Sequence, residues 1–274
     1  RKKDMNLVYK ELLHFKENYG VEYNYFWADT FLSWNDREFD QFCEMYADIR
    51  LPFWMQTRPE TITEDKVKRL AGVGLHRISF GLEHGNEAFR KKLLKREWKN
   101  KAIIDALKIP ARYGVAFSVN NITGFPTETR ELAMDTIELN RHIDSHNQNL
   151  YSFVPFHGTP LRTLCEEMGL VKPDTITKAL TDKPMLIQKQ YSVEEIEGLQ
   201  KCFVLYVKMD KKHWKDIQRA EADTPEGNRI FEELRREYLD STPAAAGIEN
   251  SEQSNVPDLE YGLEKSGASK IEKC

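Results

Sequence analysis

The stretch RISFGLEHGNEAFRKKLLKRE, residues 77–97, combines a predicted buried strand with a charged end. Ile78, Phe80 and Leu82 lie in one apolar run, and a carboxylate, Glu83, closes that run. A glycine-containing turn then leads into a helix that carries two arginines. A carboxylate is costly to bury without a partner, so its position at the end of an apolar strand favours a functional site there.

The same strand-then-helix arrangement recurs along the chain. Strands are predicted at 21–29, 51–57, 75–81, 115–124 and 148–156, and helices at 1–20, 36–50, 61–74, 86–95, 101–113, 128–145, 159–169, 191–222 and 224–239. Most of the strands are near-continuous apolar runs, which is typical of a parallel sheet covered by helices. No G-x-G-x-x-G follows the first strand, which disfavours a dinucleotide-binding sheet. The sequence therefore predicts an α/β fold built as a barrel or partial barrel.

Three polar residues are predicted to cap helices. Thr61 and Glu64 have the spacing of a capping box, and Thr127 follows a Gly-Phe-Pro turn just before the helix at 128–145. Ser192 precedes two glutamates in the first turn of the long helix at 191–222.

The composition narrows the class of protein. The net charge of -4 gives no basic footprint, so no nucleic-acid partner is indicated. No apolar run approaches the roughly 18 residues of a membrane span. The four cysteines show neither metal-finger nor redox spacing, which favours buried thiols and a reducing, cytoplasmic location.

The array opens with a helix rather than a strand. In a right-handed β-α array that helix returns from an earlier strand, so we expect a strand just upstream of Arg1. We expect three parts: a barrel at 1–170, a connector with helices at 171–240, and a disordered tail at 241–274 that has few large apolar residues.

Polar side chains follow every predicted strand. In β-α barrels the carboxyl ends of the strands and the loops after them hold the functional groups. The candidates at these ends are Asp29, Thr30, Arg58, Glu83, Asn120, Asn121 and His157. Five polar strand ends on one rim predict a binding site.

Several of these residues also have an ordinary structural interpretation. Asp29 could cap the following helix, Arg58 could pair with Glu60 at the surface, and one of the two asparagines could form a turn. His157 is as well explained by an ordinary loop. On the helix after Glu83, Arg96 is the better candidate for reaching the barrel mouth, and Arg90 is expected to be solvated.

A set of motifs together resembles the radical S-adenosylmethionine (radical SAM) superfamily. The motifs are FWADTF, TRPE, RISFGLEHGNEAFRKKLLKR, NNITGFPTET and PFHGTPL, and they cover about residues 4–170. They are similar to the branch with elongator-subunit-like, methylthiotransferase-like and cobalamin-dependent members. The resemblance implies a partial (β/α)6 TIM-like barrel, lacking its first strand here, with a C-terminal helical extension.

The resemblance also implies roles for the rim residues. Asp29 and Thr30 match the loop near the methionine amino group, and Glu83 matches the position that contacts the ribose or amino group. Arg96 matches the arginine that pairs with the methionine carboxylate. Asn120, with Asn121 beside it, matches the ribose contact, and the turn that begins at Gly124 matches the one under the adenine.

The cofactors implied are S-adenosylmethionine, a [4Fe-4S] cluster and, in some members of the branch, cobalamin. The family's C-x-x-x-C-x-x-C motif, which holds the cluster, is absent from the sequence, and we expect it upstream of Arg1. The implied activity is generation of a 5′-deoxyadenosyl radical that modifies a small organic substrate, by C-methylation or cyclisation in the cobalamin-dependent members. A reductant such as flavodoxin or ferredoxin is the implied partner.

Two other functions stay open on the sequence. One is a cluster-free barrel that binds a nucleoside or a protein partner without catalysis. The other is an ordinary metal- or acid/base-dependent barrel enzyme, which is disfavoured because the rim lacks a carboxylate-histidine cluster with metal spacing.

Overall fold

The computed structural model describes residues 3–179 and 182–241. The strands are β1 (Asn24–Phe26), β2 (Phe53–Thr57), β3 (Leu75–Glu83), β4 (Ala116–Thr123) and β5 (Asn147–Ser152). The helices are α1 (Met5–Tyr19), α2 (Asp36–Ile49), α3 (Glu64–Val73), α4 (Glu87–Leu94), α5 (Asn100–Leu107), α6 (Ile109–Arg112), α7 (Arg130–Asn140), α8 (Pro160–Glu167), α9 (Val193–Lys208), α10 (Trp214–Ala220) and α11 (Pro225–Ser241), with short 3₁₀ turns η1 (Pro59–Thr61) and η2 (Lys211–His213).

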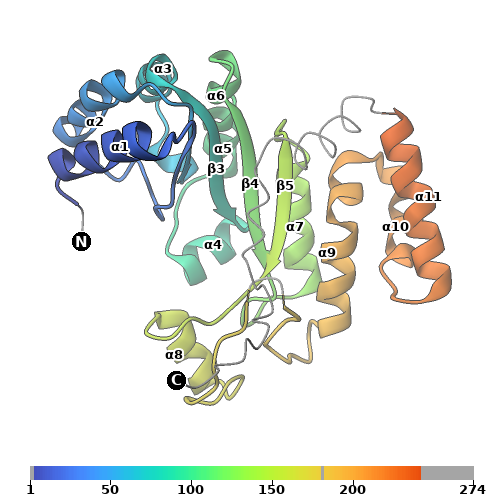
Figure 1. Cartoon of the computed structure of the whole chain (residues 1–274). Coiled ribbons are helices and arrows are strands. Elements are labelled where there is room, and N and C mark those ends of the chain that lie inside the picture. Colours follow the sequence, from blue (N-terminus) through green and yellow to red (C-terminus); the bar gives the residue numbers. More distant parts are fainter. Residues whose placement is uncertain (1–2, 180–181, 242–274) are drawn as a thin grey trace, which may run out of the picture.

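The five strands form one parallel sheet in the order β1-β2-β3-β4-β5. The sheet does not close, because β1 and β5 each pair with one described strand only. Helices α1–α3 lie toward the β1 end and α9–α11 toward the β5 end (Figure 1). An open parallel sheet with intervening helices confirms the predicted α/β partial barrel, with one strand fewer than the six implied by the resemblance.

The hydrophobic core lies on one face of this sheet, between the strands and the helices. Phe53, Met55, Ile78, Phe80 and Val119 are fully buried there, against apolar side chains of α2, α3 and α5. This face supplies the continuous packing that a parallel sheet needs to bury its apolar surface.

The opposite face, which we call the polar face, differs from the sequence interpretation. It carries Trp54, Gln56, Ser79, Ser118 and Asn120, so the strands alternate instead of being apolar on both sides. The Trp54 indole donates to Ser79 Oγ at 2.9 Å, and Ser79 bonds Ser118 Oγ at 3.0 Å. Small and polar side chains in register leave this face free of a second helix layer, as expected inside a barrel.

Two predicted helix caps are wrong, each by two residues. Thr63, and not Thr61, caps α3 by accepting from the N–H of Lys66, because Thr61 belongs to η1. Likewise Thr129, and not Thr127, caps α7. The predicted cap at Ser192 is confirmed, and the structure shows that Glu195 completes a capping box with it.

The predicted long helix at 191–222 is broken into α9, η2 and α10. Arg141, the residue that follows α7, donates to the carbonyls of Tyr206, Val207 and Met209, which satisfies the carbonyls at the end of α9. Asp210 then caps η2 by accepting from the N–H of Lys212 at 2.8 Å. The helix therefore ends where a partner from another element binds its free carbonyls.

The division of the chain into three parts stays a prediction. Helix α9 packs on both α7 and β5, so the part from 171 onward is joined to the sheet by direct contact. Of the expected tail, Ser241 closes α11, and residues 242–274 lie outside the described residues. None of the described helices is long and apolar enough to cross a membrane.

Candidate functional site at the carboxyl ends of the strands

Glu83 ends β3 in an unusual backbone conformation. Its φ is +73°, in the left-handed region that residues other than glycine rarely adopt. The side chain folds back over Gly81, where a Cβ atom would stand 2.4 Å from Glu83 Oε1. Gly81 therefore makes room for this carboxylate.

The folded-back carboxylate belongs to a row of polar groups. Gly81 pairs in register with Asn120 of β4, and Asn120 pairs with Asn149 of β5. Asn149 Nδ2 donates to Asn120 Oδ1 at 2.9 Å, which leaves the Asn120 amide NH2 without a protein partner among the described residues. One edge of the polar face thus carries a row of three polar side chains. Glu83 offers an acceptor, Asn120 offers a donor, and Asn149 adds a second amide.

Arg96 is brought to this row, as predicted, but its guanidinium is already engaged. It is nearly buried and forms a two-pronged ion pair with Glu60, Nε to Oε1 at 2.8 Å and Nη2 to Oε2 at 2.7 Å. Nη1 donates to Gly81 O at 2.9 Å and lies 3.5 Å from Glu83 Oε1. The prediction that Arg96 binds a methionine carboxylate stays a prediction.

Arg58 and Arg90 also differ from the structural alternatives weighed on the sequence. Glu60 pairs with Arg96 and not with the exposed Arg58, whose positive charge acts on Glu83 and Glu60 from nearby. Arg90, expected to be solvated, is fully buried and donates to His84 O at 2.6 Å, to Trp98 O and to Asn100 Oδ1. That expectation was wrong because Arg90 ties the segment after α4 to the end of β3.

The remaining predicted residues fall into separate places. Asn121 lies on the helix-covered face, fully buried, and exchanges hydrogen bonds with Asn140 of α7. Asp29 and Thr30 line a groove of about 910 Å³ beside the start of α1, which none of the other predicted site residues lines. Gly124 begins a buried turn, with φ +83°, directly after β4.

The pKa values of the two rim glutamates, Glu83 and Glu60, are shifted in opposite directions. Desolvation raises the pKa of Glu83, and the charges of Arg96 and Arg58 only partly offset it. Burial would also raise the pKa of Glu60, but the hydrogen bonds and charge of Arg96 outweigh it and hold that pKa below its usual value. The structure therefore contains one carboxylate satisfied by its ion pair and another that lacks a strong donor.

We expect Glu83→Gln and Glu60→Gln to change stability with opposite signs. The folded chain binds the Glu83 proton more tightly than the unfolded chain does. Ionisation of Glu83 therefore lowers the free energy of unfolding as the pH rises from about 4.5 through the raised pKa of the folded state. Glutamine does not ionise, so Glu83→Gln removes this loss. Glu60 has the opposite effect: when ionised, it stabilises the fold at pH values above its usual pKa. This stabilisation is lost as the pH falls through the lowered pKa of the folded state. At pH 7, urea denaturation should show a gain of about 0.5–1 kcal/mol for Glu83→Gln and a loss of about 1–2 kcal/mol for Glu60→Gln. Equal losses in both would contradict this assignment.

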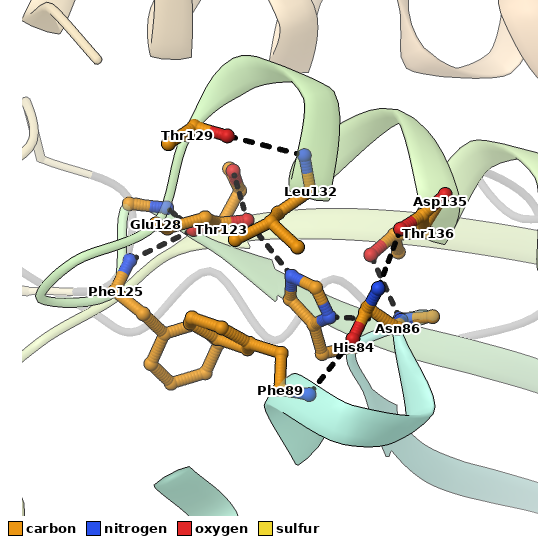
Figure 2. A network of polar contacts seen from close by, with 12 residues as sticks. His84, Asn86, Phe89, Thr123, Phe125, Glu128, Thr129, Leu132, Asp135 and Thr136 are labelled. Carbon is orange, nitrogen blue, oxygen red and sulfur yellow. Dashed lines mark hydrogen bonds and ion pairs between the residues drawn. The ribbon is translucent and has the colours of Figure 1, made fainter. Parts of the chain in front are cut away.

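Sequence reasoning missed three residues of this region: His84, Glu128 and Asn149. The side chains of His84 and Glu128 are fully buried and 3.1 Å apart, Nε2 to Oε1, at the base of the Gly124 turn (Figure 2). The signal available for Glu128 was its place four residues after Gly124, in GFPTE, where a carboxylate can reach back to the amides of the turn. Asn149 stands beside the polar residues Asn147 and Gln148 at the start of β5, so no local pattern marked it as the residue that faces Asn120.

The comparisons with known proteins agree with the fold. The family model described as the radical SAM superfamily matches residues 1–139. The chain belongs to the radical SAM superfamily.

Related sequences are considerably longer than this chain. An uncharacterized methyltransferase of Pyrococcus horikoshii is 26% identical over 208 residues, which are 75% of this chain and 45% of that protein. A tRNA-2-methylthio-N(6)-dimethylallyladenosine synthase of Fusobacterium nucleatum is 26% identical over 165 residues, 57% of this chain and 35% of that protein. The radical SAM chain therefore spans less than half the length of the curated relatives it matches.

Solved structures show the same fold at low identity. The cobalamin-dependent S-adenosylmethionine radical enzyme OxsB, with aqua-cobalamin and S-adenosylmethionine bound, superposes with a TM-score of 0.55 and 12% identity, over 87% of this chain and 42% of that one. The radical methyltransferase TsrM of Kitasatospora setae, with tryptophan and a cofactor analogue bound, gives a TM-score of 0.51 and 15% identity, over 68% and 38%.

Proposed function

We propose that this chain is the cofactor-binding barrel of a radical SAM enzyme that modifies a small organic substrate. The observation that carries the proposal is Glu83. It has a left-handed backbone, it is desolvated, and it depends on a glycine for space, while its contact with Arg96 is long at 3.5 Å. A strained and poorly satisfied carboxylate is retained when it binds a ligand.

The polar row fits the adenosine part of S-adenosylmethionine. In our proposal Glu83 accepts from ribose hydroxyls or the amino group, Asn120 donates its free amide NH2 to the ribose, and the turn at Gly124 lies under the adenine. Asn121 has no place in this contact, because it faces α7. Asp29, Thr30 and the arginines of the rim are proposed for the methionine end.

The residues described do not fit the iron-sulfur cluster. Within 3–179 and 182–241 no group of three or more His, Cys, Asp or Glu could hold a metal ion. Burial raises the pKa of Cys43, that of Cys165 to about 11 and that of Cys202 to about 12, so these cysteines are thiols at neutral pH rather than the thiolates that bind iron. In our proposal the cluster is held by cysteines other than Cys43, Cys165 and Cys202.

Beside a cluster held by other cysteines, bound S-adenosylmethionine would supply hydrogen-abstraction chemistry toward a substrate. The chain's own share of the work is to hold the adenosine rigidly and to present the polar face to the substrate. Methylation or ring formation with cobalamin is the finer form of the proposal. It is supported by the methyltransferase relative and by the cobalamin-bound neighbours of the same fold.

Binding of 5′-methylthioadenosine tests the adenosine site without any cluster. We expect titration calorimetry to show binding to the chain, and Glu83→Ala to weaken it at least about tenfold, since a charge-assisted hydrogen bond contributes about 1.5–3 kcal/mol. Glu97→Ala, which removes an exposed glutamate of the same segment, is the matched control and should bind like the unchanged chain. Equal affinity in Glu83→Ala and Glu97→Ala would refute the role of Glu83.

A second experiment separates catalysis from simple binding. The chain extended by a segment with C-x-x-x-C-x-x-C, reconstituted anaerobically with iron and sulfide and then reduced, should release 5′-deoxyadenosine from S-adenosylmethionine. Binding of the nucleoside without this product would favour the alternative function, a nucleoside-binding module without catalysis. The observation that supports this alternative is that no group of metal-binding side chains occurs among the described residues.

A further inference from the structure

The turn at residues 124–127 is held from two sides by buried side chains. From the segment just before α7, the Glu128 carboxylate accepts from the N–H of Gly124 at 2.6 Å and of Phe125 at 2.9 Å (Figure 2). From the connector, Gln188 donates to Phe125 O at 2.9 Å and Gly124 O at 3.4 Å, and accepts from the N–H of Thr127 at 3.0 Å. The backbone of this turn is thus fixed by side-chain partners on both faces.

The same carboxylate also holds the end of β3. His84 Nδ1 accepts from the N–H of Asn86 at 3.0 Å, so the proton of a neutral imidazole is on Nε2, which donates to Glu128 Oε1 at 3.1 Å. The hydroxyl of Thr123 adds a longer contact of 3.4 Å. Glu128 therefore receives donors from two successive strand ends.

These contacts couple two residues of the rim. His84 follows Glu83 directly in the chain, and Gly124 begins the turn after the neighbouring strand β4. The turn has little room to relax on its other side, because a Cβ atom at Gly124 would stand 3.1 Å from the Ile196 side chain of α9. A change at Glu128 must therefore alter the spacing between Glu83 and the turn.

We propose that Glu128 is a positioning residue that sets this spacing, so that an adenosine group fits between the Glu83 carboxylate and the Gly124 turn. The proposal rests on the function proposed above and extends it to a residue that does not touch the ligand. Glu128→Gln keeps the size of the side chain but replaces one acceptor oxygen with an NH2 group. That group would face donors, so at least one contact to the turn or to His84 breaks.

The test compares binding with stability in the full 274-residue chain. We expect Glu128→Gln to weaken 5′-methylthioadenosine about tenfold in titration calorimetry, since small misplacements of supporting groups cost this much or more. In ¹H–¹⁵N spectra the Gly124 amide proton should move upfield as it loses its carboxylate acceptor. The control is Tyr46→Phe, which removes a buried hydroxyl bonded to Asn24 and Leu51 O, on α2 away from the turn. It should change the melting temperature without changing affinity.

The outcomes separate the two proposals. If the unchanged chain does not bind 5′-methylthioadenosine, the proposed adenosine site is refuted, and this inference with it. If the unchanged chain binds and folded Glu128→Gln binds equally well, only the positioning role is refuted. Should Glu128→Gln fail to fold, Gln188→Ala loosens the same turn from the connector. Weaker binding in that variant supports the inference, and unchanged binding overturns it.

Discussion

Replacing Gly85 with alanine should destabilise the fold by about 3 kcal/mol or more, because the new methyl group has no space. A Cβ atom there would stand 2.1 Å from the carbonyl oxygen of Asp135 and 2.5 Å from Cα of Thr136, both backbone atoms of α7. The Gly85 N–H donates to Thr136 Oγ1 at 2.9 Å, so pushing the two segments apart also breaks a buried hydrogen bond. Urea denaturation measures the loss.

The matched control is the same substitution at Gly72, which should change stability in the opposite direction. Gly72 lies inside α3 with nothing within 4 Å of the added Cβ atom. Alanine is favoured over glycine within a helix by about 0.5–1 kcal/mol, so Gly72→Ala should stabilise the chain. Equal stability of Gly85→Ala and Gly72→Ala would contradict the close contact between α7 and the turn after β3.

Replacing Arg90 with alanine should also destabilise the chain strongly, by about 3 kcal/mol. The truncation leaves a cavity and deprives the buried carbonyl of His84 and the half-buried carbonyl of Trp98 of their donor. It also frees Asn100, whose Nδ2 donates to Gly85 O at 2.8 Å. The segment that leads into α5 should then detach from α4, with faster amide exchange around Asn100 as the local readout.

Two further variants test the cause of that loss. Arg90→Met fills much of the space without donating, and should still lose about 2 kcal/mol if the hydrogen bonds matter. Lys92→Ala changes an exposed lysine on the same helix and should stay within about 0.5 kcal/mol of the unchanged chain. Full stability in Arg90→Met would show that the hydrogen bonds of Arg90 contribute nothing net.

Much of the fold could be predicted from the sequence because it depends on local patterns. The apolar face of α2 and the stop at Gly20 mark helices that the structure contains. The polar face of the sheet could not be predicted in the same way. Ser79 and Ser118 stand in runs that look apolar overall, and only their strand register places them together away from the core.

The candidate site was predictable as a location, but less so residue by residue. Strand ends in a parallel sheet share an edge, and this brings Glu83 and Asn120 together. The sequence does not show which way a side chain at such an end points, so Asn120 and Asn121 looked equivalent although they face opposite sides. It also cannot show that Arg96 meets Glu60, 36 residues earlier in the chain.

The order of the strands in the sheet bears on how the chain folds during synthesis. Because the spatial order equals the chain order, each strand finds its partner among residues made just before it, and no strand waits for a distant one. The sheet can therefore grow from one edge as the chain leaves the ribosome. Its last edge, β5, is covered only when α9 has been made, since Gln200 of α9 donates to Leu150 O. Until then the nascent chain exposes the outer edge of β5, whose unpaired backbone groups can pair with another chain and cause aggregation.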